Sequence, residues 1–261
     1  MNLELDGAVT LVAGASKGIG LACARAFAAA GARVVGVART GRVLEEAAAE
    51  MRRDELAMAT EVADVGDEAA VLALVERVER EHGPISVLVC SAGAARRFPP
   101  EELGGDAFRQ GMDAKYFTTM YLLDAVVRRM AERGRGSVVN IVGQGGRRAA
   151  PHHIAGGAAN AALMLATVGY ANAYAARGVR VNAVNPGLTR TTRLEEGFEA
   201  QARSGGGSRD ELLAAAVASV PMGRLAEPCE IADVALFLAS ARASYVTGAV
   251  IPMDGGTASV I

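Results

Sequence analysis

The sequence predicts an α/β domain built on a single doubly wound parallel sheet of about seven strands flanked by helices. Short apolar runs rich in β-branched residues alternate along the chain with helical patterns. Most of these runs are apolar without alternation, which is typical of strands buried on both faces of a parallel sheet. The 261 residues, 51% of them hydrophobic, are enough for one full core, and no linker divides residues 1–261.

The predicted elements follow one another in a regular βα order. The strand candidates are residues 8–14, 33–38, 55–62, 85–93, 137–143, 179–187 and 248–256. Helical patterns cover residues 19–31, with Gly31 as a cap, and residues 68–84, stopped by Gly83 and Pro84. After the sixth strand, two short helices, Leu194–Arg203 and Arg209–Ser219, flank the low-complexity stretch SGGGS at 204–208. We therefore expect a mobile substrate loop or lid around residues 190–222, called the lid segment below.

Composition excludes several classes of protein. The formal net charge of −2 gives no basic field for nucleic acid or anionic lipid. The three cysteines, Cys23, Cys90 and Cys229, fit neither a disulfide framework nor a zinc site, so we expect no metal and a reducing compartment. The N-terminus carries no recognisable secretory signal, and we expect a cytoplasmic protein.

One stretch has the length of a membrane span. No Asp, Glu, Lys or Arg lies between Arg148 and Arg177. A proline and five polar side chains are too many for a lone helix facing lipid: Pro151, His152, His153, Asn160, Thr167 and Asn172. We therefore predict no membrane partner, and instead a helix rich in Ala and Gly that is covered on both sides.

A glycine-rich turn follows the first strand. In GASKGIG, residues 14–20, glycines let the backbone turn sharply, approach a pyrophosphate and begin a helix whose N-terminus faces the anion. An ordinary tight βα turn is the alternative. The cofactor-binding candidates in this turn are Gly14, Ser16, Lys17, Gly18, Ile19 and Gly20.

The end of the second strand indicates which nicotinamide cofactor is preferred. Ala38 and Arg39 stand where NAD-binding sheets usually place an acidic residue for the ribose diol. A guanidinium can bind a 2′-phosphate bidentately, and Lys17 adds a second cation. This favours NADP(H) over NAD(H), the alternative being that both cations are solvated surface charges.

Over nearly its whole length the chain resembles the short-chain dehydrogenases/reductases. The resemblance is carried by residues 14–20, by Asp64-Val65, by SAG at 91–93, by NPG at 185–187 and by YVTGAVIPMDGG at 245–256. It implies a Rossmann-like fold and further cofactor contacts from Asp64, Val65, Ser91, Ala92, Gly93, Pro186, Gly187 and Thr189. It also implies a homo-oligomer, a dimer or homotetramer, built on helices around 108–133 and 151–177.

Four positions depart from this family's pattern. Its enzymes normally use an Asn, a Ser and a Tyr-x-x-x-Lys pair. Counting along this chain places Lys115 at the family's asparagine position, Gly143 at its serine position, Gly156 at its tyrosine position and Asn160 at its lysine position. Gly143 and Gly156 can donate no hydrogen bond from a side chain, so we expect them to enlarge the cleft beside the nicotinamide. Lys115 and Asn160 form a reciprocal exchange that keeps one cation and one amide, with Asn160 still able to bond the nicotinamide ribose.

Lys115 is the first candidate for moving a proton. It falls in or beside the apolar stripe formed by Met112, Thr119, Leu123, Val126 and Met130. Burial there would lower its pKa toward a useful range. The alternative is a lysine whose amine reaches the surface.

Two more side chains are catalytic candidates beside Lys115 and Asn160. If the helix has already begun at His153, this residue shares a face with Gly156 one turn later; the alternative is a helix cap or an interface residue. Gln144 offers an amide next to Gly143, or else bonds only the backbone of its loop.

The sequence thus predicts an NADP(H)-dependent oxidoreductase that passes hydride between the nicotinamide and a carbonyl, alcohol or activated alkene of a small molecule, with a non-standard proton donor. The alternatives are a non-catalytic NADP(H)-binding protein and a non-redox isomerase or dehydratase. Residues 191–222 should cover the pocket, with Leu194, Phe198 and Leu212–Leu213 as an apolar lining. Four arginines, Arg147, Arg148, Arg190 and Arg193, could instead attract an acidic group.

Overall fold

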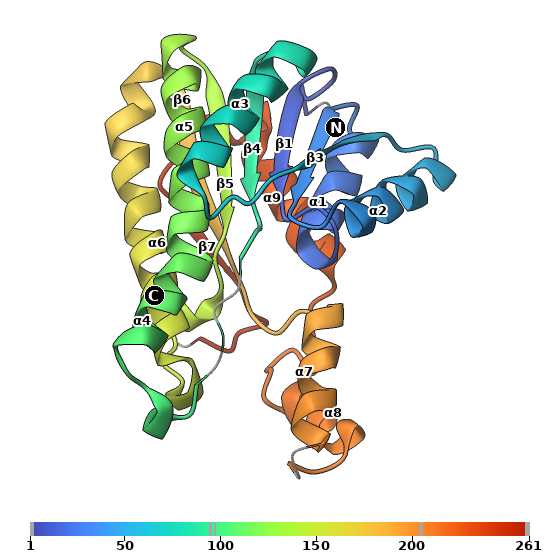
Figure 1. Ribbon diagram of the computed structural model, residues 1–261, viewed down its shortest axis with the longest axis vertical. Helices are drawn as coiled ribbons and strands as arrows, with labels where there is room; N and C mark the ends of the chain where they lie inside the picture. The colour runs from blue at the N-terminus through green and yellow to red at the C-terminus, as the bar shows by residue number, and fades with distance from the viewer. Residues whose placement is uncertain (1–2, 94–95, 97, 204–205, 259–261) are drawn as a thin grey trace.

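The fold is a seven-stranded parallel sheet between two layers of helices (Figure 1). A computed structural model of the chain describes residues 3–93, 96, 98–203 and 206–258. The strands run in the order β3-β2-β1-β4-β5-β6-β7, and every pair is parallel. Their bounds are β1 Val9–Ala13, β2 Arg33–Ala38, β3 Met58–Val62, β4 Ile85–Cys90, β5 Gly136–Ile141, β6 Val179–Pro186 and β7 Val250–Met253. The predicted fold class is confirmed.

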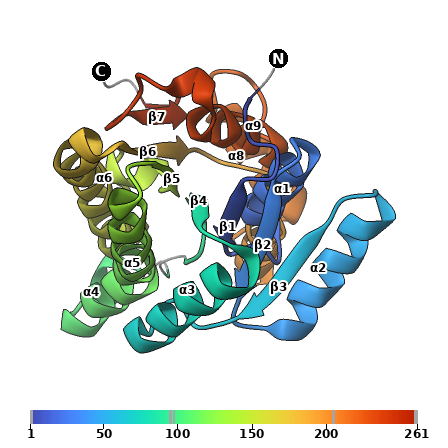
Figure 2. The same ribbon diagram turned by 90° about the horizontal axis from the view of Figure 1, so that it is seen from above.

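The helices divide between the two faces of the sheet (Figure 2). One face carries α1 (Gly18–Ala29), α2 (Gly41–Arg53) and α9 (Pro228–Ala239), and the other carries α3 (Glu68–His82), α5 (Thr118–Glu132) and α6 (Ile154–Tyr174). The remaining helices are α4 (Gly105–Gly111), α7 (Thr192–Arg203) and α8 (Arg209–Ala218), with a π-helix η2 (Met112–Phe117) and the 3₁₀ turns η1 (Pro100–Glu102), η3 (Gln144–Gly146), η4 (Pro151–His153), η5 (Ala175–Arg177) and η6 (Ala241–Ala243).

The uniformly apolar strands are buried on both faces, as their patterns predict. In β1, Val12 packs into the core beneath α1 and α9, while Leu11 and Ala13 pack into the core beneath α3 and α5. Burial of both faces removes the need for alternating polar residues. Helix α3 ends at Gly83 as predicted, with φ +97°, and at its start the Asp67 side chain accepts from the amide of Ala69 at 2.9 Å.

The apolar helix at 151–177 packs into the domain. By length and composition, Pro151–Arg177 is the one helix of the described residues that could cross a membrane, and 39% of its most apolar window is buried. Ala155, Leu163 and Ala171 are among the α6 residues that are buried within the domain. The prediction of a covered helix holds for this inner face.

One predicted helix is irregular, whereas the two helices of the lid segment lie close to their predicted positions. The helix expected through 108–133 is not regular, because η2 inserts a π-helical segment between α4 and α5. The lid segment holds two helices close to the predicted ones, and both project below the carboxyl ends of the strands (Figure 1). Of SGGGS, residues 204–205 lie outside the described residues.

Candidate functional site

The glycine turn lies where the strand order reverses. Strand β1 has β2 on one side and β4 on the other, and ligands of open α/β sheets bind at such a switch point. Gly14, at φ +81°, approaches β4 so closely that a Cβ there would lie 2.9 Å from the backbone of Ser91 and Ala92. A Cβ on Gly20 would collide with the carbonyl oxygen of Gly14. These glycines therefore let the glycine turn lie against Ser91 and Ala92. Gly93 packs on the carbonyl of Ala114.

The start of α1 is suited to an anion. The helix begins at Gly18, no side chain caps it, and its first turn holds no acidic residue. Its first backbone N–H groups therefore keep their positive partial charge. The turn, with Ser16 and Ile19 half-buried in it, fits the diphosphate of a dinucleotide.

The two predicted phosphate-binding cations lie at the surface. Arg39 is exposed at the end of β2. Lys17 is also exposed, but its Nζ lies 3.8 Å from Oε1 of Glu196 on α7. Thr191, just before α7, comes within 3.4 Å of the position of a Cβ on Gly18. The lid segment therefore touches the glycine turn at two points.

The other predicted cofactor contacts lie at the ends of neighbouring strands. Asp64 is exposed after β3 and accepts from the amide of Gly66 at 2.9 Å, while Val65 is buried. Pro186 closes β6 and is buried, and Gly187 follows it. The hydroxyl of Thr189 donates to the carbonyl of Gly187 at 3.2 Å, and Thr189 is 7% exposed.

Lys115 is buried, so the alternative of a surface lysine is wrong. It is 7% exposed, and its Nζ donates to the carbonyl oxygen of Ile141, the last residue of β5, at 2.8 Å. Burial, followed by the positive charge of Arg193, lowers its pKa from 10.5 to about 8. The thiol of Cys90 favours the charged amine, but burial raises the pKa of that thiol to about 12. Lys115 is thus a buried amine that titrates close to neutral pH.

The π-helix explains how Lys115 reaches this place. It lies within η2, where the wider turn changes the facing of side chains relative to a regular helix. The hydroxyls of Thr118 and Thr119 donate to the Lys115 carbonyl at 3.0 and 3.1 Å. Such bonds satisfy a backbone group that the irregular turn exposes.

Asn160 lies beside Gly143, and η3 lies close to α6. A Cβ on Gly143 would lie 3.1 Å from Nδ2 of Asn160, which is itself 6% exposed. A Cβ on Gly145 would lie 2.6 Å from the His153 ring, and one on Gly146 would lie 2.8 Å from the Ala161 amide. The glycines of η3 therefore let this turn pack directly on α6, and the enlarged cleft beside the nicotinamide stays a prediction.

His153 does not lie where a regular helix would place it. Helix α6 begins at Ile154, so His153 precedes it, in a 3₁₀ turn and with φ −133°. Its ring lies over Gly145, with Cδ2 2.6 Å from the position of a Cβ on that glycine. Gln144 turns toward the end of β6: its Oε1 is buried without a hydrogen bond and lies 3.3 Å from the position of a Cβ on Gly187.

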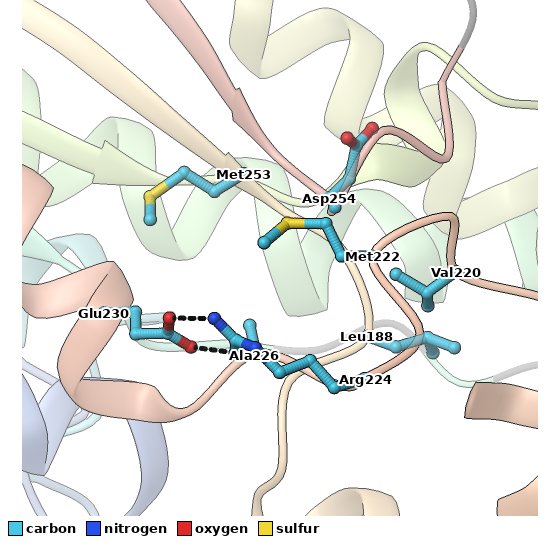
Figure 3. A pocket seen from close by; sticks show the side chains of 9 residues that line it. Leu188, Val220, Met222, Arg224, Ala226, Glu230, Met253 and Asp254 are labelled. Atoms are coloured by element: carbon cyan, nitrogen blue, oxygen red, sulfur yellow. Dashed lines mark hydrogen bonds and ion pairs between the residues drawn. The ribbon is translucent and has the colours of Figure 1, made fainter.

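A pocket lies next to this region, where Val220 and Met222 of the lid segment meet Met253 and Asp254 at the end of β7 (Figure 3). It has a volume of about 120 Å³ and is lined by Leu188, Val220, Met222, Arg224, Ala226, Glu230, Met253, Asp254 and Gly255. Arg224 binds Glu230 through both guanidinium nitrogens, at 2.6 and 2.8 Å. The apolar lining predicted from Leu194, Phe198 and Leu212–Leu213 is not part of this pocket.

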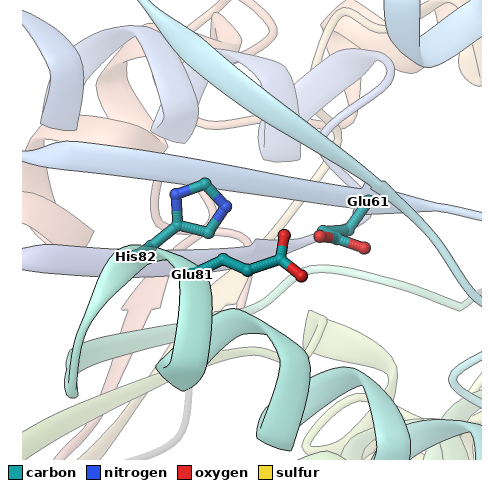
Figure 4. Close-up of side chains that lie close together, drawn as sticks. All are labelled: Glu61, Glu81 and His82. Atoms are coloured by element: carbon teal, nitrogen blue, oxygen red, sulfur yellow. The ribbon is translucent and has the colours of Figure 1, made fainter.

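One group of possible metal ligands lies elsewhere, on β3 and the end of α3 (Figure 4). Ligand atoms of Glu61, Glu81 and His82 lie within 4.8 Å of one another. Both carboxylates already pair with arginines: Glu61 with Arg77 at 2.7 Å, and Glu81 with Arg80 at 2.9 Å. A cation there would have to displace these guanidinium groups.

With the fold and this geometry established, comparison with known proteins identifies the family. The family model described as enoyl-(acyl carrier protein) reductase matches residues 14–258. The chain therefore belongs to the short-chain dehydrogenases/reductases, and it is an oxidoreductase of that type that binds a nicotinamide cofactor.

Named relatives and solved structures agree with this membership. The chain is 39% identical to a galactitol 2-dehydrogenase (L-tagatose-forming) of Cereibacter sphaeroides, over 97% of this chain and 96% of the relative. It is 38% identical to a cis-4-hydroxycyclohexanecarboxylate dehydrogenase of Sinomonas cyclohexanicum, over 97% of each. The structure of L-sorbose reductase from Gluconobacter frateurii with NADPH and L-sorbose matches with a TM-score of 0.93 and 28% identity, covering 100% of both chains.

Sequence reasoning missed three partners of the predicted residues. Glu196, Cys90 and Arg193 all act on a predicted site residue. They lie far from Lys17 and Lys115 in the sequence, and only the folded chain brings them together.

Proposed function

We propose that this protein is an NADP(H)-dependent oxidoreductase that interconverts a hydroxyl and a carbonyl group of a small molecule, with Lys115 handling the proton. The observation that supports it best is the buried amine of Lys115, whose pKa is lowered to about 8. A general acid or base works best when its pKa lies near the working pH. The named relatives act on polyols and hydroxy acids, and the matching reductase binds NADPH.

In this mechanism the bound cofactor supplies or accepts a hydride at nicotinamide C4. In the reductive direction, the Lys115 ammonium donates a proton to the substrate oxygen as negative charge develops there. In the oxidative direction, the neutral amine accepts the hydroxyl proton. The Ile141 carbonyl takes one hydrogen bond from Nζ and leaves the other donors of the ammonium free to turn toward a substrate.

The catalytic segment departs from the family's pattern, and we assign the remaining roles accordingly. Gly143 and Gly156 provide no side-chain donor. Asn160 would hold the nicotinamide ribose, and Gln144 would offer its amide beside the reacting carbon. His153 would support η3 rather than transfer a proton, since its ring lies over Gly145.

The cofactor preference rests on the second strand. Arg39 and Lys17 would bind the 2′-phosphate, and Asp64 and Val65 would border the adenine. Residues 190–222 would act as the lid over the substrate. The cytoplasm, where NADP(H) is available, is the compartment we propose.

We further propose a homo-oligomer, a dimer or a tetramer. Helix α4 leaves Phe108 exposed by 44%, and helix α6 leaves Ile154 and Leu165 exposed by 45 and 75%. Large apolar side chains on neighbouring helices favour burial against a second copy. Light scattering after gel filtration would distinguish dimer, tetramer and monomer.

A titration of NADPH fluorescence followed by a turnover assay tests the proposal. Tight NADPH binding, weaker NADH binding and turnover of a polyol or hydroxy acid are expected. Tight binding without turnover of any alcohol or ketone would instead support the non-catalytic alternative, which the missing donors at Gly143 and Gly156 favour. Conversion of a substrate without a change in cofactor absorbance would indicate non-redox chemistry.

A further inference from the structure

We propose that Gln144 and Asn185 together bind the carboxamide of the nicotinamide ring, with Oε1 of Gln144 accepting from its NH₂ group and Nδ2 of Asn185 donating to its carbonyl oxygen. This inference deepens the proposed function by naming two residues that orient the ring, and it rests on that function only for the presence of a nicotinamide. It follows from two polar groups without partners, from their place in the fold and from the chemistry of a primary amide.

Two buried polar atoms near the ends of β5 and β6 have no hydrogen bond to any residue that the structure describes. They are Oε1 of Gln144, an acceptor, and Nδ2 of Asn185, a donor. Asn185 is 1% exposed, and solvent is excluded from both atoms, so water does not replace the missing partners. Buried polar groups that stay unpaired destabilise a protein, and native interiors hold few of them. A bound molecule that carries one donor and one acceptor would satisfy both groups.

The backbone of η3 holds the two side chains close together. The amide of Gly143 donates to Oδ1 of Asn185 at 3.1 Å, which fixes the orientation of this side chain and leaves Nδ2 as its free end. Gln144 follows Gly143, and its Oε1 lies 3.3 Å from the position of a Cβ on Gly187. Gly187 follows Asn185 and Pro186 in the chain. Both unpaired groups therefore lie at the junction of η3 with the carboxyl end of β6.

This junction lies on the side of the sheet over which the nicotinamide half of the cofactor would extend. The diphosphate site at the start of α1 is at the switch point between β1 and β4. Arg39 and Asp64 follow β2 and β3, so the adenosine half would take that side and the nicotinamide half would cross the ends of β4, β5 and β6. Lys115, whose Nζ donates to the carbonyl of Ile141 at the end of β5, lies on this second side.

A primary amide matches the two unpaired groups. Its carbonyl accepts and its NH₂ group donates, so it can bond both side chains at once, and the nicotinamide carboxamide is the primary amide of the cofactor. This group is attached next to the ring carbon that transfers the hydride, so holding it fixes which face of the ring is turned to the substrate. Because both protein atoms are enclosed, η3 must shift slightly to admit the carboxamide, and Gly143, at φ +139°, gives the start of this turn the backbone freedom to do so.

Analogues that differ only at the carboxamide test this assignment by binding, without turnover. In the 3-acetylpyridine analogue a methyl group replaces the NH₂ group, and in the thionicotinamide analogue sulfur, a weak acceptor, replaces the oxygen. Calorimetry measures the affinity of each oxidised form, in the NADP⁺ series or, if NAD⁺ binds more tightly, in the NAD⁺ series. The variants are Q144M, which keeps the volume and loses the acceptor, and Q110M, a control at an exposed glutamine of α4.

The wild type should bind the acetylpyridine analogue about tenfold more weakly than the parent dinucleotide, since tenfold is about 1.4 kcal/mol, the size of one buried hydrogen bond. Q144M should bind the parent dinucleotide about tenfold more weakly and the analogue as the wild type does, so that the discrimination disappears. Q110M should match the wild type. The thionicotinamide analogue should lose about threefold in affinity for the wild type and for Q144M alike, because this loss falls on the bond from Asn185.

Equal affinity of the wild type for the acetylpyridine analogue and the parent dinucleotide would overturn the proposal. Discrimination that Q144M keeps would also overturn it, because another group would then accept from the NH₂ group. So would equal losses of both ligands in Q144M together with a lower free energy of unfolding, since Gln144 would then only hold η3 in place. Equal affinity for the thionicotinamide analogue would remove Asn185 from the site. Discrimination that depends on Gln144, in a protein that converts no substrate, would support this site and refute the redox function alone.

Discussion

Replacing Lys115 with methionine should make the protein more stable at neutral pH, although it removes a hydrogen bond. Methionine fills a similar volume without a charge. Lowering the pKa of the amine from 10.5 to about 8 means that the fold disfavours its protonated form by about 3 kcal/mol. The lost bond to the Ile141 carbonyl offsets about 1 kcal/mol of this. The free energy of unfolding of K115M should therefore exceed that of the wild type by about 2 kcal/mol at pH 7.

The advantage should vanish in alkali. Between pH 8 and 10.5 the unfolded chain binds more protons at Lys115 than the folded chain, so wild-type stability rises with pH across this window relative to the variant. Above pH 10.5 the amine becomes largely neutral in both states, and K115M should there be slightly the less stable protein.

Urea unfolding followed by far-ultraviolet circular dichroism at pH 7 and pH 10 measures this difference; the chain has no tryptophan for a fluorescence readout. Equal protein concentrations are needed, because oligomers change apparent stability. The control is K17M, which alters an exposed lysine and should shift stability by less than about 1 kcal/mol at either pH. If K115M were less stable than the wild type at pH 7 by the same amount as at pH 10, the buried-amine account would be refuted.

Three further predictions concern the cofactor and the packing of η3. R39A should weaken NADPH binding about tenfold or more and leave NADH binding unchanged, as measured by nicotinamide fluorescence; equal losses for both would remove Arg39 from the 2′-phosphate site. E196Q removes the exposed ion pair with Lys17 and should strengthen NADPH binding about twofold to threefold, because such a pair contributes under about 1 kcal/mol. Unchanged affinity would mean that this ion pair does not compete with the 2′-phosphate for Lys17. G146A should lower the free energy of unfolding by about 1 to 3 kcal/mol, because its Cβ would meet the Ala161 backbone. The control G197A, at a helix position with open space around the Cβ, should be neutral or slightly stabilising. Similar effects of the two substitutions would contradict the close approach of η3 to α6.

The sequence predicts the sheet well because its strands are buried on both faces. In β1, β2 and β4 the apolar run itself marks the strand, with little dependence on the rest of the chain. The glycine turn is equally predictable from the sequence. Gly20 is required by its contact with the Gly14 carbonyl six residues earlier, and Gly14 by its contact with the backbone that follows the adjacent strand β4.

The environment of Lys115 is only partly predictable from the sequence. Its place in an apolar stripe predicted burial and a lowered pKa, and both are found. The π-helix was not predictable, because no proline or glycine inside 112–117 marks it. The tight contact of η3 with α6 was not predictable, because it depends on how closely two backbones approach at Gly145 and Gly146, and these segments meet only in the folded chain.

The pH dependence of turnover tests the central claim most directly, namely that Lys115 handles the proton. With saturating substrate and NADP⁺, kcat for oxidation should rise with pH through about 8, and kcat for ketone reduction with NADPH should fall through the same value. K115M should lose most turnover in both directions and any residual rate should lack this ionisation, while NADPH affinity stays within about twofold of the wild type. Wild-type turnover in K115M, with the same dependence on pH, would contradict the account.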